Sequence, residues 1–319
     1  MGHEVVHFDY IGHAEVDKDG MNDLFLSAVR GGKFDLVIIA TNIDECYTDA
    51  LDQAKKLTIT CAWNSDDDWR WEDYSKTLCP HFSYMATTYR DVYERNRGKY
   101  PNLLLSQWGC PGFYDGLNTK KDIDFSFVGQ IHGIREHNVS ILQSKAGLQT
   151  FGAGTRKIEA RICNLPFLLM DILKSGGSRN SKQNLKKWIL ARITAKDDAL
   201  EDYKAVNKIW CKSKISYTPL ENSHQTGLQI KGRIFEMGMS GTLMLCNRNQ
   251  TLDDYYTRNV EYVDYEDIED CITKAKYYLS HESDRQSIAR NYYERTKREH
   301  MWYHRLEQMF RQMGLGKNN

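Results

Sequence analysis

The chain has 319 residues, of which 41% are hydrophobic and 27% charged, and its formal net charge is zero. This length allows two domains of ordinary globular composition, and the balanced charge excludes an overall field that would recruit nucleic acid or an anionic membrane. No apolar run approaches the roughly 18 residues that a membrane span needs, and the start lacks the pattern of a signal peptide. The eight cysteines form no C-x-x-C pair. We therefore expect a cytoplasmic protein with reduced thiols.

Predicted strands and helices alternate through the first part of the chain. The apolar run at 34–40 is typical of a strand that is buried on both faces of a parallel sheet. The other predicted strands are 4–8, 57–62, 82–87 and 102–106, and the predicted helices are 21–30, 45–56 and 90–97. This alternation indicates βαβ units and a doubly wound parallel sheet.

An acidic segment, CAWNSDDDWRWEDY at 61–74, follows one of these strands. The carboxyl end of a parallel strand is the usual position of a site. Asp67 or Asp68 could serve there as a general base, because neighbouring indoles exclude water and raise a carboxyl pKa. A solvated surface loop whose aspartates cap the next helix explains the segment equally well.

A second α/β series begins with a predicted strand at 124–128. It is followed by Gly129, a short turn, Arg135 and a helix that ends near residue 144. A turn of this kind presents backbone N–H groups and a cation to a phosphate. A tight turn that only packs the helix on the sheet would need the same glycines.

The segment 214–248 carries the strongest local signal. It predicts a strand at 215–218, a polar loop at 221–227, a short helix with Lys231, Arg233 and Glu236, and a strand at 242–246. Two cations and a carboxylate beside such a loop suit a diphosphate and a ribose diol. Ordinary exposed helix residues are the competing interpretation.

A local basic zone lies at 156–192, where nine basic residues face only Glu159 and Asp171. It could meet an anionic acceptor, a phospholipid surface or nucleic acid, although a solvated helix face is the commoner meaning of such a run. The remaining predictions are helices at 197–210 and 265–279, a strand at 260–263, and a long helix at 282–313 that bends near His300 and packs back on the body.

Three segments, 123–135, 227–247 and 279–305, together resemble the glycosyltransferases of the spore-maturation CgeB-like type, related to group 1, family-4-like enzymes. The resemblance implies the GT-B architecture, in which two Rossmann-like doubly wound α/β domains face each other across a cleft. It implies an acceptor domain at 1–118, a nucleotide-sugar domain at 119–298 and a final helix at 299–319 that crosses back to the first domain. Relatives have one more strand before the start of this chain, so the first strand is either missing or precedes Met1.

The resemblance also implies roles for individual residues. Glu236 would take the place of the second glutamate of the E-x7-E motif, on the ribose hydroxyls. Lys231 and Arg233 would neutralise the donor diphosphate, with Gly129 and Arg135 on its other side. The first glutamate of the motif is replaced by Leu228 and Glu221 is too early to substitute for it. Because that first glutamate is absent, contacts to the hydroxyls of the sugar must come from Asn222, Ser223, His224 or elsewhere, and Tyr217 is a further candidate for donor binding.

These features predict a metal-independent glycosyltransferase without a cofactor, in which a nucleotide-diphosphate sugar, UDP-linked, is the co-substrate. The acceptor would be a hydroxyl of a glycan, a small molecule, a protein or a nucleic acid, and Asp67 or Asp68 the base. Three alternatives stay open: a transferase acting on modified nucleic-acid bases, a non-catalytic nucleotide-binding module, and a sugar-nucleotide epimerase.

Overall fold

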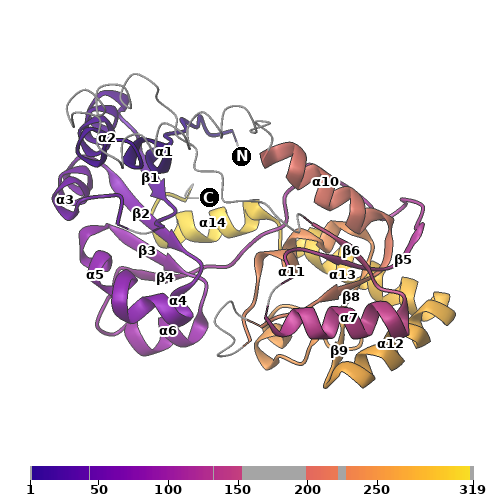
Figure 1. The fold of residues 1–319 in the computed structure, drawn as a ribbon. Coiled ribbons are helices and arrows are strands. Elements are labelled where there is room, and N and C mark those ends of the chain that lie inside the picture. The colour runs from indigo at the N-terminus through magenta and orange to yellow at the C-terminus, as the bar shows by residue number, and fades with distance from the viewer. Residues whose placement is uncertain (1, 43, 132, 153–198, 222–227, 317–319) are drawn as a thin grey trace, which may run out of the picture. The chain divides into compact units, whose positions relative to one another are not determined.

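The computed structural model describes residues 2–42, 44–131, 133–152, 199–221 and 228–316, the side chains of 199–202 excepted. These residues form two compact units, each built on a parallel β-sheet (Figure 1). One unit contains residues 2–107 and 308–316, and the other contains residues 108–152 and 199–307. Among the described residues, no helix is both long enough and apolar enough to cross a bilayer.

The first unit has four parallel strands in the sequential order β1-β2-β3-β4. The strands are β1 (Leu36–Ile39), β2 (Ile59–Asn64), β3 (Tyr84–Thr87) and β4 (Leu103–Leu105). The α-helices are α1 (Tyr10–Ala14), α2 (Lys18–Gly32), α3 (Thr48–Leu57), α4 (Asp67–Arg70), α5 (Lys76–Leu78) and α6 (Arg90–Asn96), with a π-helix at Trp71–Ser75 and a 3-10 turn at Cys79–His81. Apolar side chains of α2, α3 and α6 pack with β1 to β4 into one core.

Two predictions for this unit are wrong. Residues 4–8 form no strand, and Val5 and Val6 are 83% and 64% exposed. Strand propensity reflects packing and pairing in a sheet, and this segment has neither. The run at 34–40 does contain β1, but β1 is an edge strand of the described sheet and its Ile38 is 44% exposed. Apolar composition alone does not reveal whether both faces of a strand are covered.

The C-terminal helices follow the prediction of a bent helix that returns to the first unit. α13 (Glu282–Glu299) and α14 (Trp302–Gln312) are separate helices that meet at His300 and Met301. The residues of α14 from Gln308 onward belong to the first unit, where Met309 packs with Cys61 of β2 and Ala86 of β3. This packing confirms the predicted crossing back of the final helix.

The second unit has five parallel strands in the order β6-β5-β7-β8-β9. They are β5 (Ile123–Val128), β6 (Gln149–Phe151), β7 (Ser213–Thr218), β8 (Leu243–Asn247) and β9 (Val263–Tyr265). Its helices, besides α13, are α7 (Ile134–Ala146), α10 (Ala199–Lys212), α11 (Gly232–Glu236) and α12 (Ile268–Ser280), with 3-10 turns at Gly238–Ser240 and Gln250–Asp254. The short strand β6 was not predicted from the sequence. The strand order reverses between β5 and β7, and ligands of open α/β sheets bind at such a switch point.

Candidate functional site

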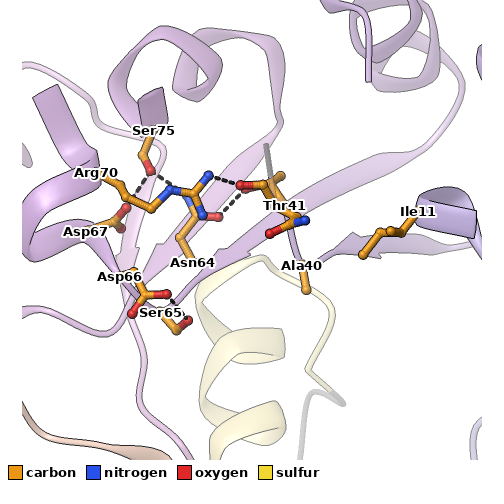
Figure 2. Close-up of a pocket in the computed structure, with 10 residues that line it drawn as sticks. Ile11, Ala40, Thr41, Asn64, Ser65, Asp66, Asp67, Arg70 and Ser75 are labelled. Atoms are coloured by element: carbon orange, nitrogen blue, oxygen red, sulfur yellow. Dashed lines mark hydrogen bonds between the residues drawn. The ribbon is translucent and has the colours of Figure 1, made fainter. Parts of the chain in front are cut away.

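A cavity of about 230 Å³ lies in the first unit where β1 and β2 end (Figure 2). Most of its lining is polar, and it consists of Ile11, Ala40, Thr41, Asn42, Asn64, Ser65, Asp66, Asp67, Arg70 and Ser75. The acidic segment was the only sequence signal for it. The residues that follow β1 were missed, because Thr41 and Asn42 belong to no motif and reach the cavity only through the parallel register of β1 with β2.

A chain of hydrogen bonds fixes Asp67 beside this cavity (Figure 2). Thr41 Oγ1 donates to Asn64 Oδ1 over 2.6 Å, and Asn64 Nδ2 donates to Ser75 Oγ over 3.0 Å. Ser75 Oγ in turn donates to Asp67 Oδ1. The chain joins the ends of β1 and β2 to the π-helix, so the orientation of the carboxyl group is set by three elements.

Burial raises the pKa of Asp67 above its usual value. The Ser75 hydroxyl opposes this shift most strongly, followed by Thr87 and the charge of Arg70. Asp67 is only 1% exposed, and its Oδ2 is buried without a partner in hydrogen-bonding geometry. A desolvated carboxylate beside a cavity has the properties of a general base.

Asp68 occupies a different position from Asp67. It is exposed and does not line the cavity, and its charge adds to the effect of burial in raising the pKa of Tyr89. The segment is not the surface loop that the sequence left possible, since residues 67–75 are helical and Trp71 is buried in the core. Asp66 is the N-cap residue of α4 but makes no side-chain cap bond. The two candidate aspartates are therefore not equivalent, and only Asp67 reaches the cavity.

In the second unit, three cations from two separate segments of the chain converge at the switch point. Arg135 Nη2 donates to the main-chain oxygen of Glu221 over 2.9 Å, and Lys231 Nζ donates to the same oxygen. Arg233 Nη1 donates to the main-chain oxygen of Val128, at the end of β5, over 3.1 Å. The main-chain oxygens just after β7 and at the end of β5 thus bind cations from α7 and from the start of α11, and so hold them at one edge of the sheet.

The cations are held close together in a desolvated setting. Burial of the Arg233 guanidinium and, to a lesser extent, the neighbouring charge of Arg135 lower its pKa to about 10, against the opposing effect of Glu236. Crowded, desolvated cations are costly for the unliganded protein. A bound polyanion would remove that cost, and this is the electrostatic character of a diphosphate site.

Gly129 is required by the position of Arg233. Its φ of 145° lies in a region that L side chains rarely adopt, and a Cβ atom there would lie 3.2 Å from both Nη atoms of Arg233. The sequence left open whether this glycine serves a phosphate site or a packing turn. The structure shows that it makes room for the Arg233 guanidinium.

We expect Gly129→Ala to destabilise the protein and to weaken nucleotide binding by about tenfold or more, because the methyl group displaces a charged ligand contact. Gly147→Ala is the matched control, since Gly147 has a φ of 68° but open space around its Cα. The control should lose about 1 kcal/mol of unfolding free energy through backbone strain alone. Chemical denaturation and calorimetric titration with UDP measure both effects, and equal UDP affinity in the two variants would contradict the role of Gly129.

Glu236 ends α11 beside these cations. Burial raises the pKa of its carboxyl group, while a hydrogen bond from Tyr203 and the charge of Arg233 lower it. The side chain is largely but not completely buried. Glu236 therefore offers a partly desolvated carboxylate next to the cation cluster, as a ribose contact requires.

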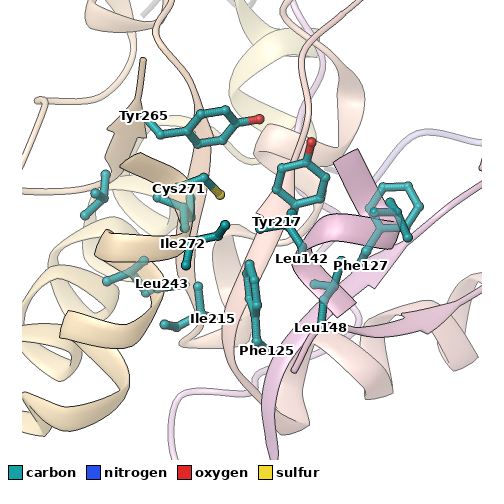
Figure 3. Close-up of a cluster of buried hydrophobic side chains, with 14 of the residues drawn as sticks. Phe125, Phe127, Leu142, Leu148, Ile215, Tyr217, Leu243, Tyr265, Cys271 and Ile272 are labelled. Carbon is teal, nitrogen blue, oxygen red and sulfur yellow. The ribbon is translucent and has the colours of Figure 1, made fainter. Parts of the chain in front are cut away.

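The remaining predicted donor residues have other placements. Tyr217 is 1% exposed, and its ring stacks on Tyr265 at 5.9 Å between the ring centroids, within a cluster that includes Phe125 and Phe127 (Figure 3). Tyr217 thus supports the site by packing. Asn222, Ser223 and His224 lie outside the described residues.

In the structure, Glu221 lies close to Leu228, the residue that replaces the first glutamate of the motif. It pairs with Leu228 in an antiparallel bridge, so residues far apart in the loop face each other. Its Oε1 accepts from Asn247 Nδ2 over 2.9 Å, and its Oε2 is buried without a hydrogen-bond partner. The spacing of seven residues between Glu221 and Leu228 did not predict this proximity, because it does not show that the chain folds back and pairs the two residues.

Two other predictions concern metals and the basic zone. Within the described ranges, no group of three or more His, Cys, Asp or Glu side chains could hold a metal ion. The whole basic zone at 156–192, on which the nucleic-acid alternative rested, falls outside those ranges.

Comparisons with known proteins agree with this architecture. A family model described as glycosyl transferase-like matches residues 187–311. A glycosyltransferase from Rickettsia africae is similar in structure, with a TM-score of 0.56 and 11% identity over 99% of this chain and 85% of that one. An alpha-glucosyltransferase in complex with UDP and DNA is similar with a TM-score of 0.58 and 12% identity, over 92% of this chain and 84% of that one. HepE of Anabaena, in complex with UDP and glucose, is similar with a TM-score of 0.55 and 10% identity, over 92% of this chain and 81% of that one. No curated protein matches in sequence.

At such low identity, these structures show the fold alone. The fold is GT-B, with two Rossmann-like α/β domains on parallel sheets. The predicted fold class is therefore confirmed.

Proposed function

We propose that this protein is a glycosyltransferase that moves a sugar from a nucleotide-diphosphate donor, UDP-linked, to a hydroxyl acceptor. The observation that carries the proposal is the convergence of Arg135, Lys231 and Arg233 at the switch point of the second sheet. The UDP present in several structures of the same fold supports the choice of nucleotide.

In this proposal the cations act on the leaving group. As the bond between the anomeric carbon and the diphosphate oxygen breaks, negative charge grows on the diphosphate. Preorganised cations in a water-poor site stabilise such a charge without reorganisation. Glu236 would hold the nucleoside by accepting hydrogen bonds from the ribose hydroxyls. The three side-chain cations carry enough charge for the site to work without a metal ion.

The acceptor would enter the cavity of the first unit, where Asp67 would orient its hydroxyl and accept its proton as the oxygen bonds to the anomeric carbon. The raised pKa of Asp67 makes it a stronger base than an ordinary aspartate. The polar lining of the cavity offers several hydrogen-bonding groups to a hydroxyl-bearing acceptor.

The proposal is tested by thermal shift and product analysis on the full chain with a panel of nucleotide sugars. A ligand that binds only the folded protein raises its Tm in proportion to its affinity, so at least one UDP-sugar should raise Tm. Transfer to an added acceptor should release UDP. Tight binding without transfer or hydrolysis would indicate a non-catalytic module, and conversion of the donor without an acceptor would indicate an epimerase.

We expect turnover to continue after removal of divalent metals, because the charge on the diphosphate is met by Arg135, Lys231 and Arg233. Activity in excess EDTA should stay within about twofold of the activity with added Mg²⁺ or Mn²⁺. Loss of turnover in EDTA that returns on adding either metal would contradict metal independence.

A further inference from the structure

Glu236 has a partner that the proposed function does not use. Tyr203 on α10 hydrogen-bonds the Glu236 carboxylate through its hydroxyl. The Tyr203 ring is itself supported by Phe113, with 5.7 Å between the ring centroids. α10 and α11 belong to the same unit but stand well apart in sequence, so the contact is a product of the fold.

The main chain of Glu236 is fixed as well. Its carbonyl oxygen accepts hydrogen bonds from the Tyr114 hydroxyl and from Cys110 Sγ, the latter at 3.6 Å. Gly232 stands one turn earlier, and a Cβ atom there would lie 3.2 Å from Glu236 Oε1 and 3.0 Å from the Trp108 ring. The carboxylate therefore lies back over the first turn of α11, and the Trp108 ring also lies against this turn. Contacts from three segments hold one side chain in one orientation.

An ionised carboxylate can accept about four hydrogen bonds, and a single hydroxyl donor satisfies only one of them. A vicinal diol supplies two more donors. Resting on the proposed function, we propose that Tyr203 is a positioning residue, which orients the Glu236 carboxylate toward the two ribose hydroxyls and so sets the preference of the site for ribonucleotides. Without Tyr203 the carboxylate would lose both its orientation and a donor that stabilises its charge.

The groups that face Glu236 allow this role to be isolated by titration. They are Arg233 on α11, Tyr203 on α10, Cys110 and Tyr114 in the segment after β4, and Tyr292 on α13. Burial raises the pKa of all three tyrosines and raises that of Cys110 to about 12, and the pKa of Arg233 is about 10. Below about pH 9, Glu236 is then the group of this cluster that changes charge.

The test compares the full chain with its Tyr203→Phe and Glu236→Gln variants. Carbon-13 NMR of labelled glutamate, with Glu236→Gln for assignment, should show the carboxyl pKa rising by about one to two units in Tyr203→Phe, because a hydrogen bond to the charged form is lost. UDP affinity should fall with acidification at a correspondingly higher pH in this variant, and Glu236→Gln should lose the pH dependence. The ratio of the Kd values for 2′-deoxy-UDP and UDP should drop from about tenfold to less than about threefold.

Tyr277→Phe is the matched control, because the exposed Tyr277 hydroxyl donates to the Asp284 carboxylate over 2.9 Å on another face of the unit. It should change neither the Glu236 titration nor the nucleotide ratio. An unchanged titration and an unchanged ratio in Tyr203→Phe, with UDP still bound, would overturn this inference alone. Failure of the unmodified chain to bind UDP would overturn the proposed function, and the ribonucleotide preference with it, whatever the titration gives.

Discussion

Replacing Arg233 by methionine is expected to raise the Kd for UDP by about 10- to 100-fold without lowering the Tm of the unliganded protein. A hydrogen-bonded contact between two charged groups contributes on the order of 1.5–3 kcal/mol, which sets the size of the loss. The unliganded protein gains at the same time, because burial and the charge of Arg135 disfavour the charged form of Arg233. Methionine fills a similar space and carries no charge, so the repulsion disappears.

Calorimetric titration with UDP and a thermal scan of the unliganded protein measure the two effects. Arg298→Ala is a suitable control, since Arg298 is exposed on α13 and pairs only with its neighbour Glu299 among the contacts described. An unchanged UDP affinity in Arg233→Met would remove Arg233 from the donor site. A large fall in Tm would show instead that the guanidinium serves mainly to satisfy the main-chain oxygen of Val128.

The fold could be predicted because its main signals are local. β5, β7 and β8 lie within two residues of their predicted positions, since each is a short segment with β-branched, aromatic or aliphatic residues between polar turns. A bend of one long helix was predicted near His300, and the structure has a break between α13 and α14 there. The His300 ring donates to the Tyr255 carbonyl over 2.9 Å and accepts from Arg305. The prediction of a strand at 4–8 was wrong, because the local sequence does not show whether a neighbouring strand is present for it to pair with. The strand β6 was not predicted, because a strand of three residues is too short to show a hydrophobic periodicity.

The site residues that lie in one sequence motif could be predicted from the residues themselves. Those that the sheet brings together from separate segments could not. Lys231, Arg233 and Glu236 share one short segment and were identified together. Arg135 lies in another segment, and only the family resemblance placed it beside them; in the structure, it joins them because β5 and β7 are neighbours in the sheet. Thr41 reaches Asp67 through Asn64 and Ser75, and no spacing along the chain announces that connection. Tyr203 had no signal at all, since a tyrosine on an amphipathic helix predicts core packing.

Asp67→Asn is expected to lower kcat by about 100- to 10,000-fold, the usual contribution of a general base, with the Kd for UDP unchanged. The amide keeps the shape of the carboxyl group but cannot take the acceptor proton. Burial raises the pKa of Asp67, so its base form is lost on acidification at a higher pH than for an ordinary aspartate. The acidic limb of the wild-type pH–rate profile should therefore lie above the pKa of a free aspartate, and the residual activity of Asp67→Asn should lack that limb.

The same variant should leave the protein equally or more stable near neutral pH. The carboxyl pKa is higher in the folded than in the unfolded state, so its stabilising contribution is present below the unfolded pKa and is lost as pH rises through the folded one. At neutral pH the buried charge is a cost that asparagine removes. Asp73→Asn is the control, because Asp73 is exposed in the same π-helix and does not line the cavity. If Asp67→Asn retained kcat within about threefold while Asp68→Asn lost it, the base would be Asp68. If both lost stability instead of turnover, the acidic segment would serve the fold and the acceptor base would have to be sought elsewhere.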